Sequence, residues 1–168
     1  FITQNNNFDF QVLLNNGLLK LDSSLGENFK LNGYYRNNDD LNFDIKILDL
    51  TLNNLYQINK NSVSGVFNSE INIKRNKENR TLNLDSKLSN LKIKNYDLGE
   101  LSLNIFGNTD YNSYAVKIDL LKDNLNPVKG EGSIIGADEG PNIDIDFAFK
   151  NFDISFIEKI GTNTMTGI

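Results

Sequence analysis

The chain has 168 residues, 17 basic and 22 acidic side chains, a net charge of −5, and neither Cys nor His. Without Cys and His there are no thiol nucleophiles, disulfides or imidazole bases, and few means of binding zinc. An acidic chain without a basic stripe is a poor ligand for nucleic acid and for anionic membrane surfaces. We therefore expect no enzyme, no cofactor or metal site, and no nucleic-acid partner.

Apolar residues at every second position dominate the chain, a pattern typical of half-buried β-strands. The first two strands are predicted at 8–14 and 19–21, on either side of the turn signal Asn15–Gly17. The sequence predicts an all-β chain of about ten short strands. Further alternation follows at 29–31, 41–47, 66–74, 82–84, 101–105, 116–120 and 143–149. Turn-forming residues are expected to separate these stretches at Gly33, 37–40, 76–79, 95–99, 107–112 and 124–130.

An internal repeat is predicted, because residues 41–66 align without gaps over residues 143–168 at an offset of 102 positions. In both copies the alternation slips by one phase, to Leu50 and to Phe152. A slip moves side chains to the other face unless a bulge or bend absorbs the extra residue, so both copies should bend there. The matching apolar positions are Leu41, Phe43, Ile45 and Ile47 over Ile143, Ile145, Phe147 and Phe149.

After each slip the apolar spacing changes to every third residue, at 52–58 and at 154–160. This spacing indicates one or two short amphipathic helices. The first copy continues from Gly65 into a further strand, whereas the second ends shortly after Gly167, and the chain begins with Phe. We therefore expect residues 1–168 to be one continuous segment of a longer protein with stacked repeats.

Two stretches combine small-residue turns with alternating strands. Residues 63–73 (VSGVFNSEINI) place an SG turn at the start of a strand, and residues 88–108 (LSNLKIKNYDLGELSLNIFGN) join an L-x-I-x-N-Y strand to LG-x-L-S-L-N. Residues 125–130 have the form of an NP…G turn. In these features the chain resembles the TamB family, among the AsmA-like envelope proteins of Gram-negative bacteria. The likeness extends over residues 41–168, and the charged segment 74–80 departs from it.

The resemblance implies an elongated, curved antiparallel sheet, a β-taco or open U-shaped trough with an apolar interior. It implies a place in the periplasm or cell envelope of a Gram-negative bacterium, with the full-length protein anchored in the inner membrane outside this segment. The family serves outer-membrane protein assembly or phospholipid transfer. The partners implied are phospholipid acyl chains or β-barrel clients in the groove, and a TamA- or BamA-like barrel-assembly protein.

The apolar alternation is consistent with the same shape but does not select it. Each inward apolar side chain is worth roughly 1.5–3 kcal/mol when removed from water, and several strands of them exceed the apolar patch that a monomer normally exposes. A second sheet covers such a face in a closed β-sandwich, whereas lipid tails cover it in an open trough. The sequence pattern alone favours the sandwich, and it is the resemblance to the TamB family that leads us to expect the trough. Its lipid groove would be lined by Leu41, Phe43, Ile45, Ile47, Leu82, Leu84, Leu101, Leu103, Ile105, Ile143, Ile145, Phe147 and Phe149.

Two other roles stay open. A structural β-sandwich or scaffold module would bind an outer-membrane assembly partner by strand augmentation, and residues 8–14, free of Lys and Arg, are the candidate edge. A piece of an outer-membrane barrel would instead carry aromatic girdles at both strand ends, a placement that the 11 Phe and 6 Tyr do not follow.

Other chemistry has weak support. Acidic residues group at 39–40, at 138–139 and at Asp144 and Asp146, but the last two alternate with apolar residues and should lie on the solvated face. The glycines between 130 and 136 have the spacing of a dinucleotide loop without the following helix, so we expect a short strand between glycine turns.

Overall fold

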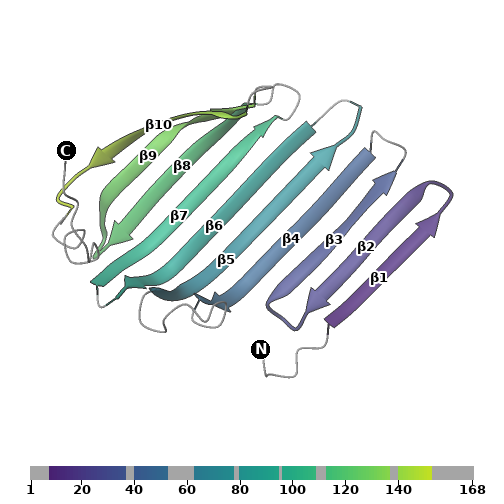
Figure 1. Cartoon of the computed structure of the whole chain (residues 1–168), viewed down its shortest axis with the longest axis horizontal. Coiled ribbons are helices and arrows are strands. Elements are labelled where there is room, and N and C mark those ends of the chain that lie inside the picture. Colours follow the sequence, from purple (N-terminus) through teal and green to yellow (C-terminus); the bar gives the residue numbers. More distant parts are fainter. Residues whose placement is uncertain are drawn as a thin grey trace.

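The computed structural model of the chain describes residues 8–36, 40–52, 63–77, 80–94, 96–108, 113–136 and 140–152. In this part the chain forms one ten-stranded antiparallel sheet, in which every strand pairs with its neighbours in sequence, from β1 to β10 (Figure 1). The expected all-β, elongated antiparallel sheet is confirmed. The helices predicted at 52–58 and 154–160 lie almost entirely outside the described residues.

The central strands are longer than the short strands that alternation predicted. The strands are β1 (Phe8–Asn15), β2 (Leu18–Leu25), β3 (Phe29–Arg36), β4 (Asp40–Thr51), β5 (Val63–Arg75), β6 (Arg80–Ile93), β7 (Tyr96–Asn108), β8 (Ser113–Lys122), β9 (Leu125–Ile135) and β10 (Asn142–Phe149). Strands β5, β6 and β7 have 13, 14 and 13 residues. They are long because β-bulges carry the strands through the positions at which the alternation changes phase.

One predicted turn region, Asn15–Gly17, contains a tight hairpin turn, and another, 124–130, overlaps one by a single residue. Asn16 and Gly17 have φ values of 45° and 77°, and Asp123 and Asn124 have φ values of 51° and 61°. Two consecutive residues with positive φ define the type I′ turn, whose twist matches that of the flanking strands. The turn predicted at 124–130 is therefore shorter than expected, because β9 already begins at Leu125.

Several glycines predicted to form turns lie inside strands. Gly33 is in β3, Gly107 in β7, and both Gly130 and Gly132 in β9. These predictions were wrong because glycine does not occur only in turns. It also occurs inside strands, at positions where a neighbouring side chain or backbone approaches closely. The expectation of a strand near residue 130 is confirmed, but this strand runs through the glycines.

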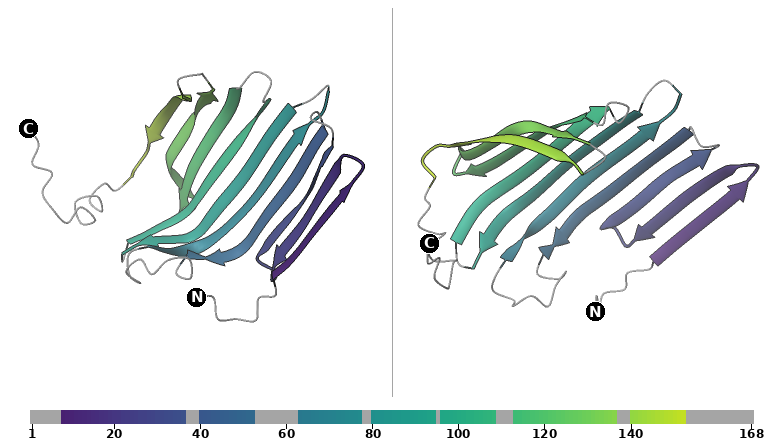
Figure 2. Two further views of the ribbon diagram at one scale, coloured as in Figure 1. Left: turned by 45° about the vertical axis from the view of Figure 1, so that its right-hand side comes forward. Right: turned by 45° about the horizontal axis from the view of Figure 1, so that its top comes forward.

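Register shifts bend the sheet at one end of its long strands. They fall between Ile47 and Leu50 in β4, between Leu88 and Leu91 in β6, and between Leu120 and Lys122 in β8. A bulge bends its strand and increases the local twist. The sheet is accordingly twisted, and it curls at its β8–β10 end (Figure 2).

The described strands form a single layer. Close contacts between strands join neighbours in the sheet, and the described part of the chain contains no second sheet across either face. The closed β-sandwich is therefore wrong for this part of the chain. The candidate edge at 8–14 does lie at an edge, since β1 is the first strand of the sheet and β10 is the last.

Candidate functional site: a continuous apolar face

The strand register gathers apolar side chains on one face of the sheet. Directly paired residues of an antiparallel sheet point to the same face. Ile45 pairs with Ile71, Ile71 with Leu84, Leu84 with Ile105, and Ile105 with Val116. One row of apolar side chains therefore runs across five neighbouring strands.

All thirteen residues predicted to line the groove lie on this face, which we call the apolar face. The register connects them through direct cross-strand pairs and through alternation within each strand. They are Leu41, Phe43, Ile45 and Ile47 of β4, Leu82 and Leu84 of β6, Leu101, Leu103 and Ile105 of β7, and Ile143, Ile145, Phe147 and Phe149 of β10.

The structure extends the predicted face by a row of which the groove prediction contained only Leu101 and Phe149. The row runs near the bulged ends of the strands, and it begins at Leu50, just after the bulge in β4. Alternation did not predict it because two serines, Ser69 in β5 and Ser86 in β6, interrupt the apolar pattern just before it. These serines lie opposite each other on the apolar face, and their Oγ atoms are 2.7 Å apart in a hydrogen bond. The row comprises Leu50, Phe67, Leu88, Leu101, Leu120, Val128 and Phe149.

The opposite side of the sheet, the polar face, carries cross-strand hydrogen bonds and ion pairs. Asn72 Nδ2 donates to Asp44 Oδ1 at 2.6 Å, and Lys46 Nζ lies 2.8 Å from Glu70 Oε1. The hydrogen bond and charge of Glu70 raise the pKa of Lys46. The polar face is thus solvated, and its cross-strand partners help to maintain the register.

Exposure of the apolar face is greatest at the two edges of the sheet. In β1, Leu14 is 76% exposed, and in β10, Ile143 and Phe149 are 60% and 64% exposed. Val116 and Leu120 of β8, next to the curled end of the sheet, are only 4% and 7% exposed, whereas Ile45 and Leu84 in the central strands are half-buried. The apolar face is thus most buried near β8, and no described strand covers it from above.

Aromatic rings extend the apolar face along β10. The ring centroids of Phe147 and Phe149 are 6.3 Å apart, and those of Phe149 and Phe152 are 6.0 Å apart. Both distances fall in the range of favourable aromatic pairs. Phe152, at which the alternation was predicted to change phase, therefore contacts the phenylalanine rings of β10.

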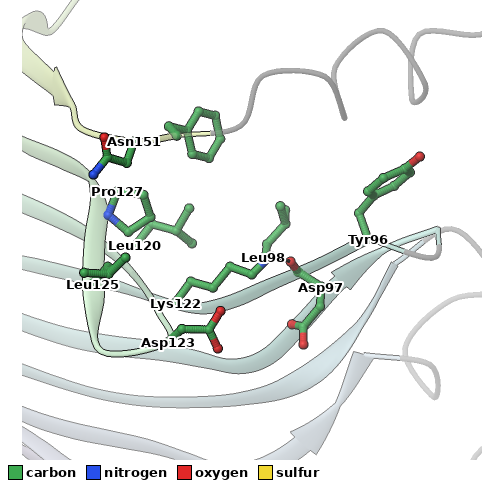
Figure 3. A pocket seen from close by; sticks show the side chains of 10 residues that line it. Tyr96, Asp97, Leu98, Leu120, Lys122, Asp123, Leu125, Pro127 and Asn151 are labelled. Carbon is green, nitrogen blue, oxygen red and sulfur yellow. Dashed lines mark hydrogen bonds between the residues drawn. The ribbon is translucent and has the colours of Figure 1, made fainter.

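A pocket of about 240 Å³ lies where the ends of β7, β8 and β9 meet the segment after β10 (Figure 3). Leu98, Leu120 and Pro127 supply apolar walls. Lys122 also lines it, and its Nζ donates to the backbone carbonyl of Asp97 at 2.7 Å. Because Leu120 also belongs to the apolar face, the pocket continues that face.

The acidic groups do not form a cleft in the described part of the chain. Asp144 and Asp146 are exposed on the polar face, as predicted, and residues 39, 138 and 139 lie outside the described residues. Asp40 accepts a hydrogen bond from Tyr34 Oη at 3.2 Å, which raises the pKa of that tyrosine. Among the described residues, no group of three or more acidic side chains is arranged to hold a metal ion.

Within the same described ranges, no helix has both the length and the apolar character needed to cross a membrane. Comparisons of the chain with protein-family models, curated proteins and solved structures found no match. The resemblance to the TamB family therefore stays an expectation drawn from the sequence.

Proposed function

We propose that this sheet is a segment of a periplasmic conduit or chaperone, whose apolar face shields phospholipid acyl chains during outer-membrane biogenesis. The observation that carries the proposal is the apolar face itself. It extends from β1 to β10 in one layer, and no other described element covers it. The likeness to the TamB family supports a location in the Gram-negative envelope, with the full-length protein anchored in the inner membrane and a TamA- or BamA-like partner.

Acyl chains suit this face because they require no directional hydrogen bonds. About seven residues of one strand span roughly 20 Å, comparable to an extended acyl chain. Contact with a tail removes both surfaces from water, at about 25 cal/mol per Å² of apolar area. Polar groups on the face lie at a few places: the hydroxyls of Ser69 and Ser86 already bond to each other, and Arg75 and Arg80 lie at the strand ends beside Leu41.

Unfolded β-barrel strands are an alternative cargo, and a scaffold role is a second candidate function. The position of β1 as the first strand of the described sheet favours the scaffold role, because residues 8–14 contain neither Lys nor Arg to discourage pairing with a partner strand. Mutations on the apolar face distinguish the two functions. They should impair lipid shielding, whereas strand augmentation uses backbone groups at the sheet edge and should be little affected.

Two exposed phenylalanines on opposite faces provide a matched test. Phe147 is 49% exposed on the apolar face, and Phe106 is 58% exposed on the polar face, where it pairs with Ala115. Phe147→Arg places a charge among acyl chains, which is costly, whereas Phe106→Arg leaves the apolar face unchanged. We expect Phe147→Arg to lower phospholipid retention and transfer between vesicles several-fold, with no such effect of Phe106→Arg.

Native mass spectrometry of gently extracted protein measures retention, and a fluorescent phospholipid assay measures transfer. Circular dichroism checks that both variants keep the β-sheet. Equal retention and transfer by Phe147→Arg, Phe106→Arg and the parent would contradict the proposed function.

A further inference from the structure

Charged side chains border the pocket at the ends of β7, β8 and β9. Asp97, Lys122 and Asp123 line it together with the apolar walls described above. Figure 3 shows these charged side chains on one side of the pocket, with Leu120 and Pro127 on another. The pocket therefore combines an apolar wall with one cation and two carboxylates.

The charged groups of the pocket are not paired with one another. Lys122 Nζ donates to the backbone carbonyl of Asp97 at 2.7 Å. The carboxylate of Asp97 accepts a hydrogen bond from the backbone N–H of Gly99 at 3.0 Å. Among the described residues, Asp97, Lys122 and Asp123 form no ion pair. Both carboxylates and the ammonium group can therefore bind a ligand without first breaking an ion pair.

Several lysines on the polar face of the same sheet do form ion pairs. Lys46 Nζ lies 2.8 Å from Glu70, and Lys87 Nζ lies 2.7 Å from Glu100. These lysines face carboxylates across neighbouring strands. Lys122 instead bonds to a backbone carbonyl, which uses only one of its three N–H donors. The pocket thus brings unpaired charges of both signs next to an apolar wall.

The size and charges of the pocket indicate the kind of ligand. Its volume of about 240 Å³ is below the roughly 300–1,000 Å³ of pockets that enclose a drug-sized ligand, so it has room for a headgroup and not for a whole phospholipid. A phosphate accepts hydrogen bonds from a lysine such as Lys122, and a primary ammonium group donates them to carboxylates such as those of Asp97 and Asp123.

Other headgroups fit these charges less well. A quaternary ammonium group has no N–H to donate, and aromatic cages are its usual binding sites. A headgroup with negative charge alone would bring that charge next to two carboxylates. A headgroup with both a phosphate and a primary ammonium group complements all three charged side chains.

The apolar face gives the acyl chains a path away from the pocket. Leu120 lines the pocket and also belongs to the apolar face. Ile118 and Val116 follow it along β8 on the same face. Val116 and Leu120 are among the most buried apolar residues of the described sheet. A headgroup in the pocket would therefore place the first carbons of its tails on the most buried part of the face.

We propose that the pocket binds the phosphoethanolamine headgroup of a phospholipid whose acyl chains lie on the apolar face. Lys122 binds the phosphate, and Asp97 and Asp123 bind the ammonium group. This inference rests on the proposed lipid function, and it specifies the class of phospholipid that the sheet prefers.

The test uses the 168-residue protein and three water-soluble compounds without acyl chains: glycerophosphoethanolamine, glycerophosphocholine and glycerophosphoglycerol. Titrations followed by NMR measure both the affinity and the location of binding. We expect saturable shifts of the amide signals of residues 96–98 and 122–125. Because the charged side chains are exposed, the preference for glycerophosphoethanolamine over the other two compounds should be about fivefold.

Conservative variants test the role of each charge. Asp97→Asn/Asp123→Asn should remove the preference, because asparagine keeps an acceptor oxygen and tolerates the positive φ of 51° at position 123 but has no charge. Asp144→Asn/Asp146→Asn removes the same charge from the exposed polar face and is the matched control. Lys122→Gln should weaken all three compounds equally, by about threefold, because they share the phosphate.

Four results would overturn the inference. They are the absence of saturable binding, equal affinities of the parent for the three compounds, shifts confined to residues outside the pocket, and loss of the preference in the Asp144→Asn/Asp146→Asn control.

Native mass spectrometry with an equimolar mixture of phosphatidylethanolamine and phosphatidylglycerol separates this inference from the proposed function. The parent should retain an excess of phosphatidylethanolamine, and Asp97→Asn/Asp123→Asn should retain both lipids without that excess. A parent that retains no phospholipid would contradict the proposed function. A parent that retains the two lipids equally would contradict the headgroup inference alone.

Discussion

The ring of Phe147 in β10 lies over Gly130 in β9. A β-carbon at Gly130 would come within 2.8 Å of Cε1 of Phe147, and within 3.3 Å of the β-carbon of Ile118. Phe43 covers Gly33 in the same manner on β3 and β4. At these two places a phenylalanine ring occupies the space that a side chain on the neighbouring strand would otherwise fill.

Gly130→Ala should lower the free energy of unfolding by about 1–3 kcal/mol, because the new methyl group forces the ring of Phe147 to move. In a Phe147→Ala background the same change should cost much less, since the obstructing ring is absent. Urea denaturation of the two single variants and the double variant measures this coupling.

Gly132→Ala is the control for that cycle. A β-carbon there would meet backbone atoms of Asp144 and Ile145, so Phe147→Ala should provide no relief. Additive effects in the cycle with Gly130→Ala would show that Phe147 does not rest on Gly130.

Gly99→Ala should destabilise the sheet by roughly 1–3 kcal/mol because its backbone is in the left-handed region and has no space for a β-carbon. Its φ is 87°, and an added β-carbon would meet the carbonyl oxygen of Leu121. Gly140 has φ of 122° with nothing within 4 Å of an added β-carbon. Thermal unfolding should therefore show a smaller loss for Gly140→Ala, and the reverse order would refute the role of the steric contact.

The buried serine pair predicts a non-additive response. Ser69 and Ser86 are 4% and 7% exposed. Ser69→Ala leaves the Ser86 hydroxyl without its partner at a cost of about 1–3 kcal/mol, whereas replacing both serines by alanine should recover most of this loss. Chemical denaturation of the single and double variants checks the prediction, which fails when the double variant is the least stable.

Asp119 predicts a pH dependence of stability. Burial raises the pKa of this carboxyl group, but hydrogen bonds from Asn126 and Lys117 and the nearby lysine charges outweigh burial, so that the pKa is lowered overall. Asn126 Nδ2 donates at 2.7 Å, and Lys117 Nζ lies 3.3 Å from the other carboxylate oxygen. A lowered pKa means that the folded state favours the charged form more than the unfolded chain does.

This stabilisation is complete above the unfolded pKa of about 3.9, and it is lost as the pH falls through the lower folded pKa. Asp119→Asn should therefore be less stable than the parent by about 1–3 kcal/mol at neutral pH, and the difference should narrow below about pH 4. Urea unfolding midpoints of the parent and Asp119→Asn, measured from neutral pH to below about pH 4, test whether the stability difference narrows in acid. A difference that widens in acid would contradict the assignment.

Much of the apolar face was predictable because alternation is a local property. A β-strand sends Phe43, Ile45 and Ile47 to one side whatever lies around it. The thirteen groove residues could therefore be chosen strand by strand, and the phase slip after Ile47 correctly indicated the bulge before Leu50.

Alternation was insufficient where small residues enter the strands. Ser69 and Ser86 hid the row that contains Phe67 and Leu88, and Gly130 resembled a turn residue. Their roles depend on partners 17 residues away in the chain, a hydroxyl for each serine and the Phe147 ring for Gly130. No local pattern contains that information.

The sequence by itself determined that the strands have one apolar and one polar side, because side-chain direction follows from the backbone of a single strand. Only the tertiary structure decided that ten such strands form one layer in chain order, with all apolar sides together. The same alternating strands are compatible with a closed sandwich and with an open sheet. The two folds differ only in whether the apolar faces of separate sheets meet, which no single strand determines.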